Sequence, residues 1–171
     1  MMNIRIATIE DSNEIYEIGK KSFIASHNKS SSEKDINAFI KMYYNPLSIT
    51  QELKNPTNNY FIISQNSALL GFSNIELNCK NSSIPSQNSS KLDRIYFLEE
   101  AFGKGFGKIL LKFNIDFSIK NEQEGIWLYT WTGNHRAIKF YKKNGFEIIG
   151  NYDYKISDTH SNPNHIMYLK F

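Results

Sequence analysis

The glycine-rich segment Phe102–Lys108, FGKGFGK, constrains the fold of this chain more than any other stretch. It follows a strand-like run, Leu92–Leu98, and precedes apolar residues at helical spacing. A strand followed by a glycine turn and a helix exposes unpaired backbone N–H groups at the positive end of the helix dipole. Glycines let an anion approach those groups, so the segment predicts a phosphate-binding turn. Taken alone, it also suits a tight turn that needs positive φ.

The order of residues in this segment excludes two familiar phosphate motifs. It contains neither the G-x-x-x-x-G-K-[ST] of a P-loop nor the G-x-G-x-x-G of a dinucleotide-binding turn. We therefore expect a phosphate compound of another class.

The size and charge of the chain narrow the remaining classes of protein. With 171 residues, it is long enough for one domain with a sizeable core, and we expect a single domain over residues 1–171. The 20 Lys and Arg and 17 Asp and Glu residues are scattered and give a net charge of +3, which does not indicate a nucleic-acid partner. No segment approaches the roughly 20 apolar residues of a membrane helix, and no signal-peptide pattern is present, so we expect no membrane association.

Residue types that hold metals or form disulfides are sparse. Cys79 is the only cysteine, which excludes an internal disulfide and a cysteine-rich metal cluster and favours a cytoplasmic location. We predict no metal site and assign no chemistry to the four histidines because they lack metal-ligand spacing; they are His27, His135, His160 and His165.

Hydrophobic periodicity and turn residues predict an alternation of helices and strands. Asn66 and Ser67 separate two β-rich runs and indicate an antiparallel hairpin, and Gly145 is a natural helix end. Residues 78–91 have the composition of a loop. The expected strands are 3–8, 59–65, 68–77, 92–98, 125–131, 146–149 and 164–171, and the expected helices are 11–26, 33–44, a short one from Pro46, one ending near Lys120, and 134–144.

A second motif follows the glycine segment and makes the pair specific. With the glycine segment, it resembles the GNAT superfamily of acyl-CoA-dependent N-acyltransferases, whose R/Q-x-x-G-x-G/A loop matches residues 102–107 except that Phe102 replaces Arg or Gln. Within that superfamily, the chain is most similar to PaiA-type polyamine N-acetyltransferases. The second motif, N-x-x-A-x-x-F-Y-x-K-x-G-F, is matched by Asn134, Ala137, Phe140, Tyr141, Lys143, Gly145 and Phe146.

The resemblance implies an α/β (α+β) fold and acetyl-CoA as co-substrate. The fold would be a mixed, mostly antiparallel, twisted sheet of six or seven strands with helices on both faces and a splay between the fourth and fifth strands. The pantetheine arm would pair with the backbone of Ile95, Tyr96 and Phe97 like an extra strand. The diphosphate would lie on the glycine segment, made of Phe102, Gly103, Lys104, Gly105, Phe106, Gly107 and Lys108.

Three further residues receive roles from the resemblance. Tyr141 would be the catalytic acid that protonates the departing CoA thiolate, although the same spacing fits a core tyrosine. Asn134 would cap its helix and contact the pantetheine arm, and Lys143 would meet a CoA phosphate. The backbone N–H of Phe97 would stabilise the tetrahedral oxyanion.

The sequence leaves the catalytic base open. An alkyl ammonium, with a pKa of about 10.4, must lose a proton before it can attack a thioester. Asp93, which strand alternation places on the face of Ile95 and Phe97, and Glu76 are weak candidates, and either suits a solvated strand face equally well.

We expect the early helices and the loop 78–91 to shape the acceptor site, with Phe23, His27, Tyr43 and Trp131 among its lining residues. A polyamine would also need acidic groups to offset the positive net charge. The available ones are Glu14, Glu17, Glu76, Asp93, Glu99 and Glu100.

Together these features favour an N-acetyltransferase that moves the acetyl group of acetyl-CoA to a primary amine of a small molecule, a polyamine being one acceptor. A protein amino terminus, an amino acid or an aminoglycoside are alternative acceptors. A non-catalytic acyl-CoA sensor is the alternative outside enzymes, and a structural domain with an accidental glycine turn is a further one. Exposed sheet edges would allow a homodimer.

Overall fold

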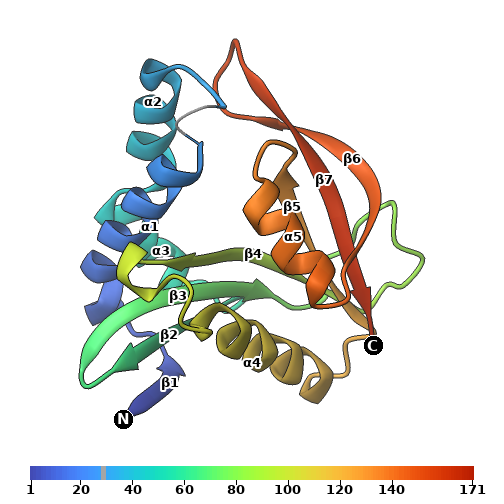
Figure 1. Cartoon of the computed structure of the whole chain (residues 1–171), viewed down its shortest axis with the longest axis horizontal. Coiled ribbons are helices and arrows are strands. Elements are labelled where there is room, and N and C mark those ends of the chain that lie inside the picture. Colours follow the sequence, from blue (N-terminus) through green and yellow to red (C-terminus); the bar gives the residue numbers. More distant parts are fainter. Residues whose placement is uncertain (28–29) are drawn as a thin grey trace.

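The computed structural model of the chain describes residues 1–27 and 30–171, which form a seven-stranded sheet with flanking helices (Figure 1). The strand order is β1-β2-β3-β4-β5-β7-β6. Neighbouring strands are antiparallel except for β4 and β5, which are parallel. This confirms the predicted mixed, mostly antiparallel sheet. The strands are β1 (Met2–Ile6), β2 (Asn58–Gln65), β3 (Ala68–Glu76), β4 (Ser89–Phe97), β5 (Gly125–Trp131), β6 (Glu147–Lys155) and β7 (Ser161–Lys170).

The helices form where the sequence supplies caps and an apolar stripe. The side chain of Ser32 caps the second helix by accepting from the N–H of Asp35, and Asn45 caps the third by accepting from the N–H of Ser48. The α-helices are α1 (Ser12–His27), α2 (Glu33–Tyr43), α3 (Pro46–Lys54), α4 (Phe106–Lys120) and α5 (His135–Lys143), and short 3₁₀ turns cover Ile9–Asp11 and Glu99–Ala101.

The two faces of the sheet bury separate apolar clusters. Leu110 and Leu111 of α4 and Tyr141 of α5 pack on one face. On the other face, Ile15 of α1 and Ile49 of α3 are both fully buried. Helices therefore cover both faces, as the sequence predicts.

The sheet opens between β4 and β5. These strands pair only at their beginnings, over Ser89–Lys91 and Gly125–Trp127. On its other edge, β4 contains a bulge: Arg94 pairs with Asn74, but the next pair is Leu92 with Ile75, so Asp93 is the extra residue. A bulge bends a strand, which explains how β4 leaves β5 and produces the predicted splay.

The carboxyl-terminal hairpin is longer than the sequence predicts. β6 continues through Lys155 and β7 begins at Ser161, whereas the expected strands cover only residues 146–149 and 164–171. The hairpin extends past α5 toward α2 (Figure 1). Its turn is anchored there because Ile156 is buried against Phe39 and Tyr44 and the amide of Asn162 donates to Ser30 Oγ at 2.9 Å.

Candidate active site

The glycine segment forms the predicted open turn before α4. Gly103 and Gly105 have φ of 74° and 85°, values that favour glycine, and an added Cβ at either position would meet nothing within 4 Å. Their conformation and the open space above them, rather than crowding by the protein, account for the glycines. Gly105 is the N-cap of α4 and offers no side-chain cap. Within residues 1–27 and 30–171, the N–H groups of Phe106 and Gly107 have no hydrogen-bond acceptor, so they are free to bind an anion.

A groove of about 560 Å³ runs from this turn along β4, and we call it the cofactor groove. It brings together most of the predicted cofactor residues, but three lie elsewhere. Lys104 points to solvent, Phe106 is buried in the core beneath the turn, and Asn134 lines a neighbouring pocket. The predicted residues that line the groove are Ile95, Tyr96, Phe97, Phe102, Gly103, Gly105, Gly107, Lys108, Tyr141 and Lys143.

The hydrogen-bonding pattern of β4 separates the roles of its three predicted residues. The N–H of Leu98 donates to Leu70 of β3 at 2.9 Å, so strand alternation directs the backbone of Tyr96 toward β3 and the backbones of Ile95 and Phe97 into the splay. Ser22 Oγ of α1 donates to the carbonyl of Phe97 at 2.8 Å. Tyr96 can therefore contribute only its side chain to a ligand, whereas Ile95 and Phe97 present main-chain groups.

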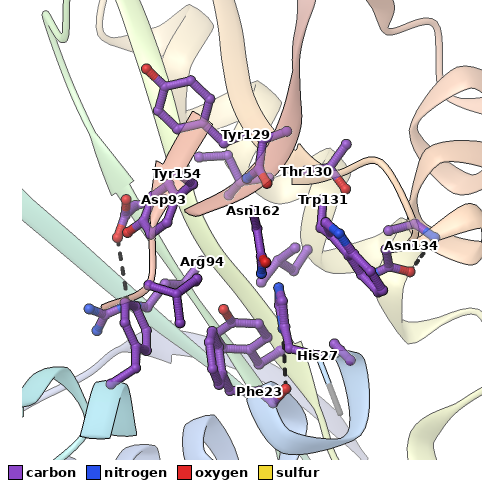
Figure 2. A pocket seen from close by; sticks show the side chains of 18 of the residues that line it. Phe23, His27, Asp93, Arg94, Tyr129, Thr130, Trp131, Asn134, Tyr154 and Asn162 are labelled. Carbon is purple, nitrogen blue, oxygen red and sulfur yellow. Dashed lines mark hydrogen bonds and ion pairs between the residues drawn. The ribbon is translucent and has the colours of Figure 1, made fainter. Parts of the chain in front are cut away.

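A second pocket, of about 220 Å³, opens between α1, α2 and the β6–β7 hairpin, and we call it the acceptor pocket (Figure 2). Aromatic side chains and polar or charged side chains both contribute to its walls. All four residues expected at the acceptor, namely Phe23, His27, Tyr43 and Trp131, line it.

The loop before β4 does not contribute to the acceptor pocket as expected. Of residues 78–91, only Lys91 lines it, and that residue belongs to β4. The loop packs elsewhere because the carbonyl of Cys79 accepts from Trp127 Nε1 at 2.8 Å and Ile84 is buried beside Trp127. Burial raises the pKa of the Cys79 thiol to about 11, so it is not a thiolate nucleophile near pH 7.

Asp93 is the one carboxylate among the lining residues that the structure gives this pocket. Its Oδ1 lies 2.6 Å from Lys91 Nζ, and its Oδ2 lies 3.5 Å from Arg94 Nε. Burial would raise the pKa of Asp93, but Lys91 and Arg94 outweigh burial and hold it below its usual value. A carboxylate stabilised in this way is a weak base.

The bulge also corrects the expected position of Asp93. Because Asp93 is the extra residue, alternation is broken: Ile95 and Phe97 pack against the core cluster on the α4 side, whereas Asp93 does not. Asp93 lines the acceptor pocket, and the edge of Ile95 also reaches that pocket. Figure 2 shows Asp93 between Arg94 and Tyr154. The remaining acidic candidates line neither cavity: they are Glu14, Glu17, Glu76, Glu99 and Glu100.

Tyr141 lines both the cofactor groove and the acceptor pocket, where the two meet. Burial raises the pKa of Tyr141, which keeps its phenol protonated at neutral pH. Its hydroxyl makes no hydrogen bond to any residue that the structure describes, which leaves it available to a ligand. The side-chain oxygen of Asn134 accepts from the N–H of Ala137 at 3.1 Å, so its predicted capping role is confirmed.

Arg136 is a site residue that the sequence reasoning missed. It stands in the first turn of α5 and lines both cavities. Its guanidinium carbon lies 4.2 Å from the ring centre of Phe102, across the mouth of the cofactor groove. Ser22 and Ser26 of α1 also line the groove. Arg136 occupies a variable position of the second motif, so no sequence signal pointed to it.

Two negative observations apply to the described part of the chain. No group of three or more His, Cys, Asp or Glu residues there could hold a metal ion. None of the helices in residues 1–27 and 30–171 has the length and apolar character needed to span a bilayer.

Several solved acetyltransferases share this fold over nearly their whole length. PaiA N-acetyltransferase from Thermoplasma acidophilum, in complex with coenzyme A, is 24% identical, with 100% of this chain and 99% of that chain covered and a TM-score of 0.79. The ribosomal-protein-S18-alanine N-acetyltransferase from Escherichia coli is 20% identical, with coverage of 99% and 94% and a TM-score of 0.67. A spermidine N-acetyltransferase chimera from Vibrio cholerae and hSSAT is 17% identical, with coverage of 99% and 95% and a TM-score of 0.70.

The family assignment comes from the sequence itself. A profile of the acetyltransferase (GNAT) family matches residues 13–146, which include the opened sheet, the uncapped α4 and the tyrosine of α5. This chain therefore belongs to the acetyltransferase (GNAT) family, whose co-substrate is acetyl-CoA.

Proposed function

We propose that this chain is a single acetyltransferase domain that moves the acetyl group of acetyl-CoA to the primary amine of a small molecule. The observation that carries the proposal is the junction of two cavities at Tyr141: the cofactor groove reaches it from the α4 side, and the acceptor pocket reaches it from the α1 and α2 side. A thioester in one cavity and an amine in the other would meet there.

In this proposal the cofactor groove binds acetyl-CoA through backbone groups. The diphosphate lies against the free N–H groups of Phe106 and Gly107, and Lys108 and Lys143 add positive charge at the wall. The pantetheine arm fills the splay and pairs with the backbones of Ile95 and Phe97.

The acetyl transfer itself then needs only a few groups of the protein. Holding the amine and the thioester together removes most of the entropic cost of their reaction. The N–H of Phe97 faces the splay and stabilises the oxyanion, and the hydroxyl of Tyr141 donates to the sulfur as the C–S bond breaks. The pKa of Tyr141, raised by burial, keeps that hydroxyl in its donating form.

Arg136 should contribute to acetyl-CoA binding. Its guanidinium carbon lies over the ring of Phe102, and within the described residues no carboxylate pairs with it, so its N–H groups can donate to a phosphate. Arg136→Gln should weaken acetyl-CoA binding about 10-fold in calorimetry, as expected for one charge-assisted hydrogen bond. Lys139→Gln, which removes the same charge from an exposed position of α5, should leave the affinity unchanged, and equal effects of both variants would contradict this role.

Among amines, a polyamine is the finer proposal. Aromatic walls suit both the methylene groups and the ammonium groups of such a ligand, and Asp93 Oδ2, 3.5 Å from Arg94, has capacity to accept from an ammonium. Solved relatives of the same fold include a PaiA N-acetyltransferase and a spermidine N-acetyltransferase.

One observation favours a second acceptor class. Three cationic side chains, Lys91, Arg94 and Arg136, line the acceptor pocket with Asp93, and this excess of positive charge would suit an amine that carries a carboxylate, such as an amino acid.

An acceptor panel separates these classes. Acetyl-CoA would be tested with an alkyl monoamine, spermidine, an amino acid, an aminoglycoside and a peptide amino terminus. If a polyamine is the substrate, Asp93→Asn should raise its KM about 10-fold and leave the KM of the monoamine unchanged, because only the polyamine has a second ammonium to bind there. Glu76→Gln, outside both cavities, is the matched control. Tight acetyl-CoA binding without turnover of any amine would instead indicate an acyl-CoA sensor.

We also propose a cytoplasmic location and a homodimer. Cys79, as the single cysteine, favours a cytoplasmic protein. The outer strands β1 and β6 give the sheet two edges at which a homodimer could form, and light scattering would measure its mass.

A further inference from the structure

We propose that His27 is the general base of the acetyl transfer, a role that rests on the proposed function. Although four histidines occur in the sequence, His27 is the one that lines either cavity among the residues described. The carboxylates expected to act as bases are poorly placed, because Glu76 lines neither cavity and Asp93 is held by two cations.

The hydrogen bond of His27 fixes which ring nitrogen can accept a proton. Nδ1 lies 3.2 Å from the carbonyl of Phe23, one turn earlier in α1. A carbonyl oxygen only accepts, so Nδ1 carries the hydrogen and donates it. In the neutral ring, Nε2 then carries the lone pair. Figure 2 shows the ring of His27 rising from α1 into the acceptor pocket, with its other nitrogen directed away from that carbonyl.

Aromatic neighbours hold the ring of His27 in this orientation. It stacks on Phe23 with ring centres 4.3 Å apart, and it lies 6.0 Å from the ring of Trp131 on β5. An imidazole packed in this way and tied by Nδ1 has little freedom to turn Nε2 out of the pocket. Burial lowers the pKa of His27, which keeps the ring neutral and able to accept a proton at neutral pH.

The position of His27 along α1 places it beside the junction of the two cavities. Ser22 and Ser26 line the cofactor groove, and Ser26 also lines the acceptor pocket. The next residue is His27. Because His27 of α1 and Tyr141 of α5 both line the acceptor pocket, an amine bound there would lie between these two helices.

The proposed step balances atoms and charges. The lone pair of the neutral amine forms the new N–C bond, and the proton that nitrogen then loses passes to His27 Nε2. The C–S bond breaks, and the sulfur takes a proton from Tyr141. The imidazolium afterwards returns its proton to solvent, and Tyr141 regains one from solvent.

The other titratable groups around the pocket should not mask the titration of His27 in a pH profile. Across from His27 stand Lys91, Asp93 and Arg94 of β4, Arg136 of α5 and Tyr43 of α2. Burial raises the pKa of the other lining tyrosines, which are Tyr44, Tyr96, Tyr129, Tyr141 and Tyr154. The pKa of Asp93 lies below its usual value and the pKa of Lys91 above, the latter because Asp93 outweighs burial. Neither changes charge between about pH 5 and pH 8. His160 does not line the pocket but contacts Asn162, which does: His160 Nε2 lies 2.9 Å from Asn162 Oδ1. Its contribution can be tested with a separate variant.

The test is a pH profile of kcat/KM with an alkyl amine on wild type and on His27→Asn. Protonation of the amine gives log kcat/KM a slope of about 1 against pH, and protonation of His27 should add another unit of slope below its pKa, which burial sets under about 6.5. His27→Asn retains an N–H near the carbonyl of Phe23 but lacks Nε2. It should lose about 100-fold in kcat/KM and keep a slope of about 1 throughout. His135→Asn, at an exposed position, and His160→Gln should retain the wild-type shape.

Calorimetry with acetyl-CoA separates a structural effect from a catalytic one. His27→Asn should bind acetyl-CoA like wild type. Retention of activity within about 3-fold by His27→Asn, or a wild-type slope of 1 down to the lowest pH at which the protein stays folded, would overturn the role of His27 while leaving the proposed function intact. The wild-type profile gives this answer even if the variant fails to fold. Absence of turnover by wild type with every amine would instead reject the proposed function.

Discussion

Tyr141→Phe should lower kcat about 100-fold, because the leaving sulfur would lose its proton donor while the shape of the pocket stays the same. Tyr141 is part of the core cluster and lines both cavities, and the substitution removes only its hydroxyl, so folding and acetyl-CoA affinity should change little. Stopped-flow or steady-state assays with acetyl-CoA and the best acceptor would measure the loss.

Tyr152→Phe is the matched control for Tyr141→Phe. It removes the same atom from an exposed tyrosine of β6 that lines neither cavity. Both variants should melt near the wild-type temperature. A Tyr141→Phe enzyme with unchanged kcat would show that this tyrosine is a core residue without a role in proton transfer.

Gly105→Ala should weaken acetyl-CoA binding about 10- to 100-fold. At a φ of 85°, alanine would cost about 1 kcal/mol of stability, and its methyl group would occupy the open space in which an anion approaches the N–H groups of α4. The loss of one charge-assisted hydrogen bond to a phosphate has this magnitude. Calorimetry with CoA would measure it.

Gly145→Ala gives the comparison needed to separate strain from ligand contact. Gly145 has a φ of 90° after α5 and lines neither cavity. Gly145→Ala should lower the melting temperature at least as much as Gly105→Ala, because its Cβ would also lie 3.2 Å from Leu169 Cδ1, but only Gly105→Ala should affect acetyl-CoA binding. Equal affinities for the two variants would mean that the cofactor does not use the start of α4.

The sequence predicted the elements whose signals are local. The glycines before α4, the cap at Ser32 and the glycine after α5 each act over one helical turn, and the structure confirms these three boundaries within a few residues. The two motifs also located most of the cofactor groove, because a backbone anion site needs a particular turn and few side chains.

The errors arose where a distant contact decides the structure. The expected strand ends at residue 149, but pairing with β7 extends β6 through Lys155. The face of Asp93 was wrong because alternation cannot predict a bulge. The ion pair of Arg94 with Glu52 at 2.9 Å joins β4 to α3, and the stack of Arg136 on Phe102 joins two segments far apart in the chain. No pattern within either segment predicts such a pair.

The extra residue in β4 explains how one strand lines two different cavities. In a regular strand, residues an odd number of positions apart point to opposite faces. Leu92 and Ile95 are three positions apart, yet both pack on the α4 side, because the extra residue between them reverses the alternation. Deletion of Asp93 would restore a single phase along the strand. The side chains of either the beginning or the end of β4 would then point to the opposite face of the sheet. Apolar side chains of the core would exchange places with residues that line the acceptor pocket. The length of this strand, counted to the single residue, therefore decides which of its side chains face the α4 cluster and which face the acceptor pocket.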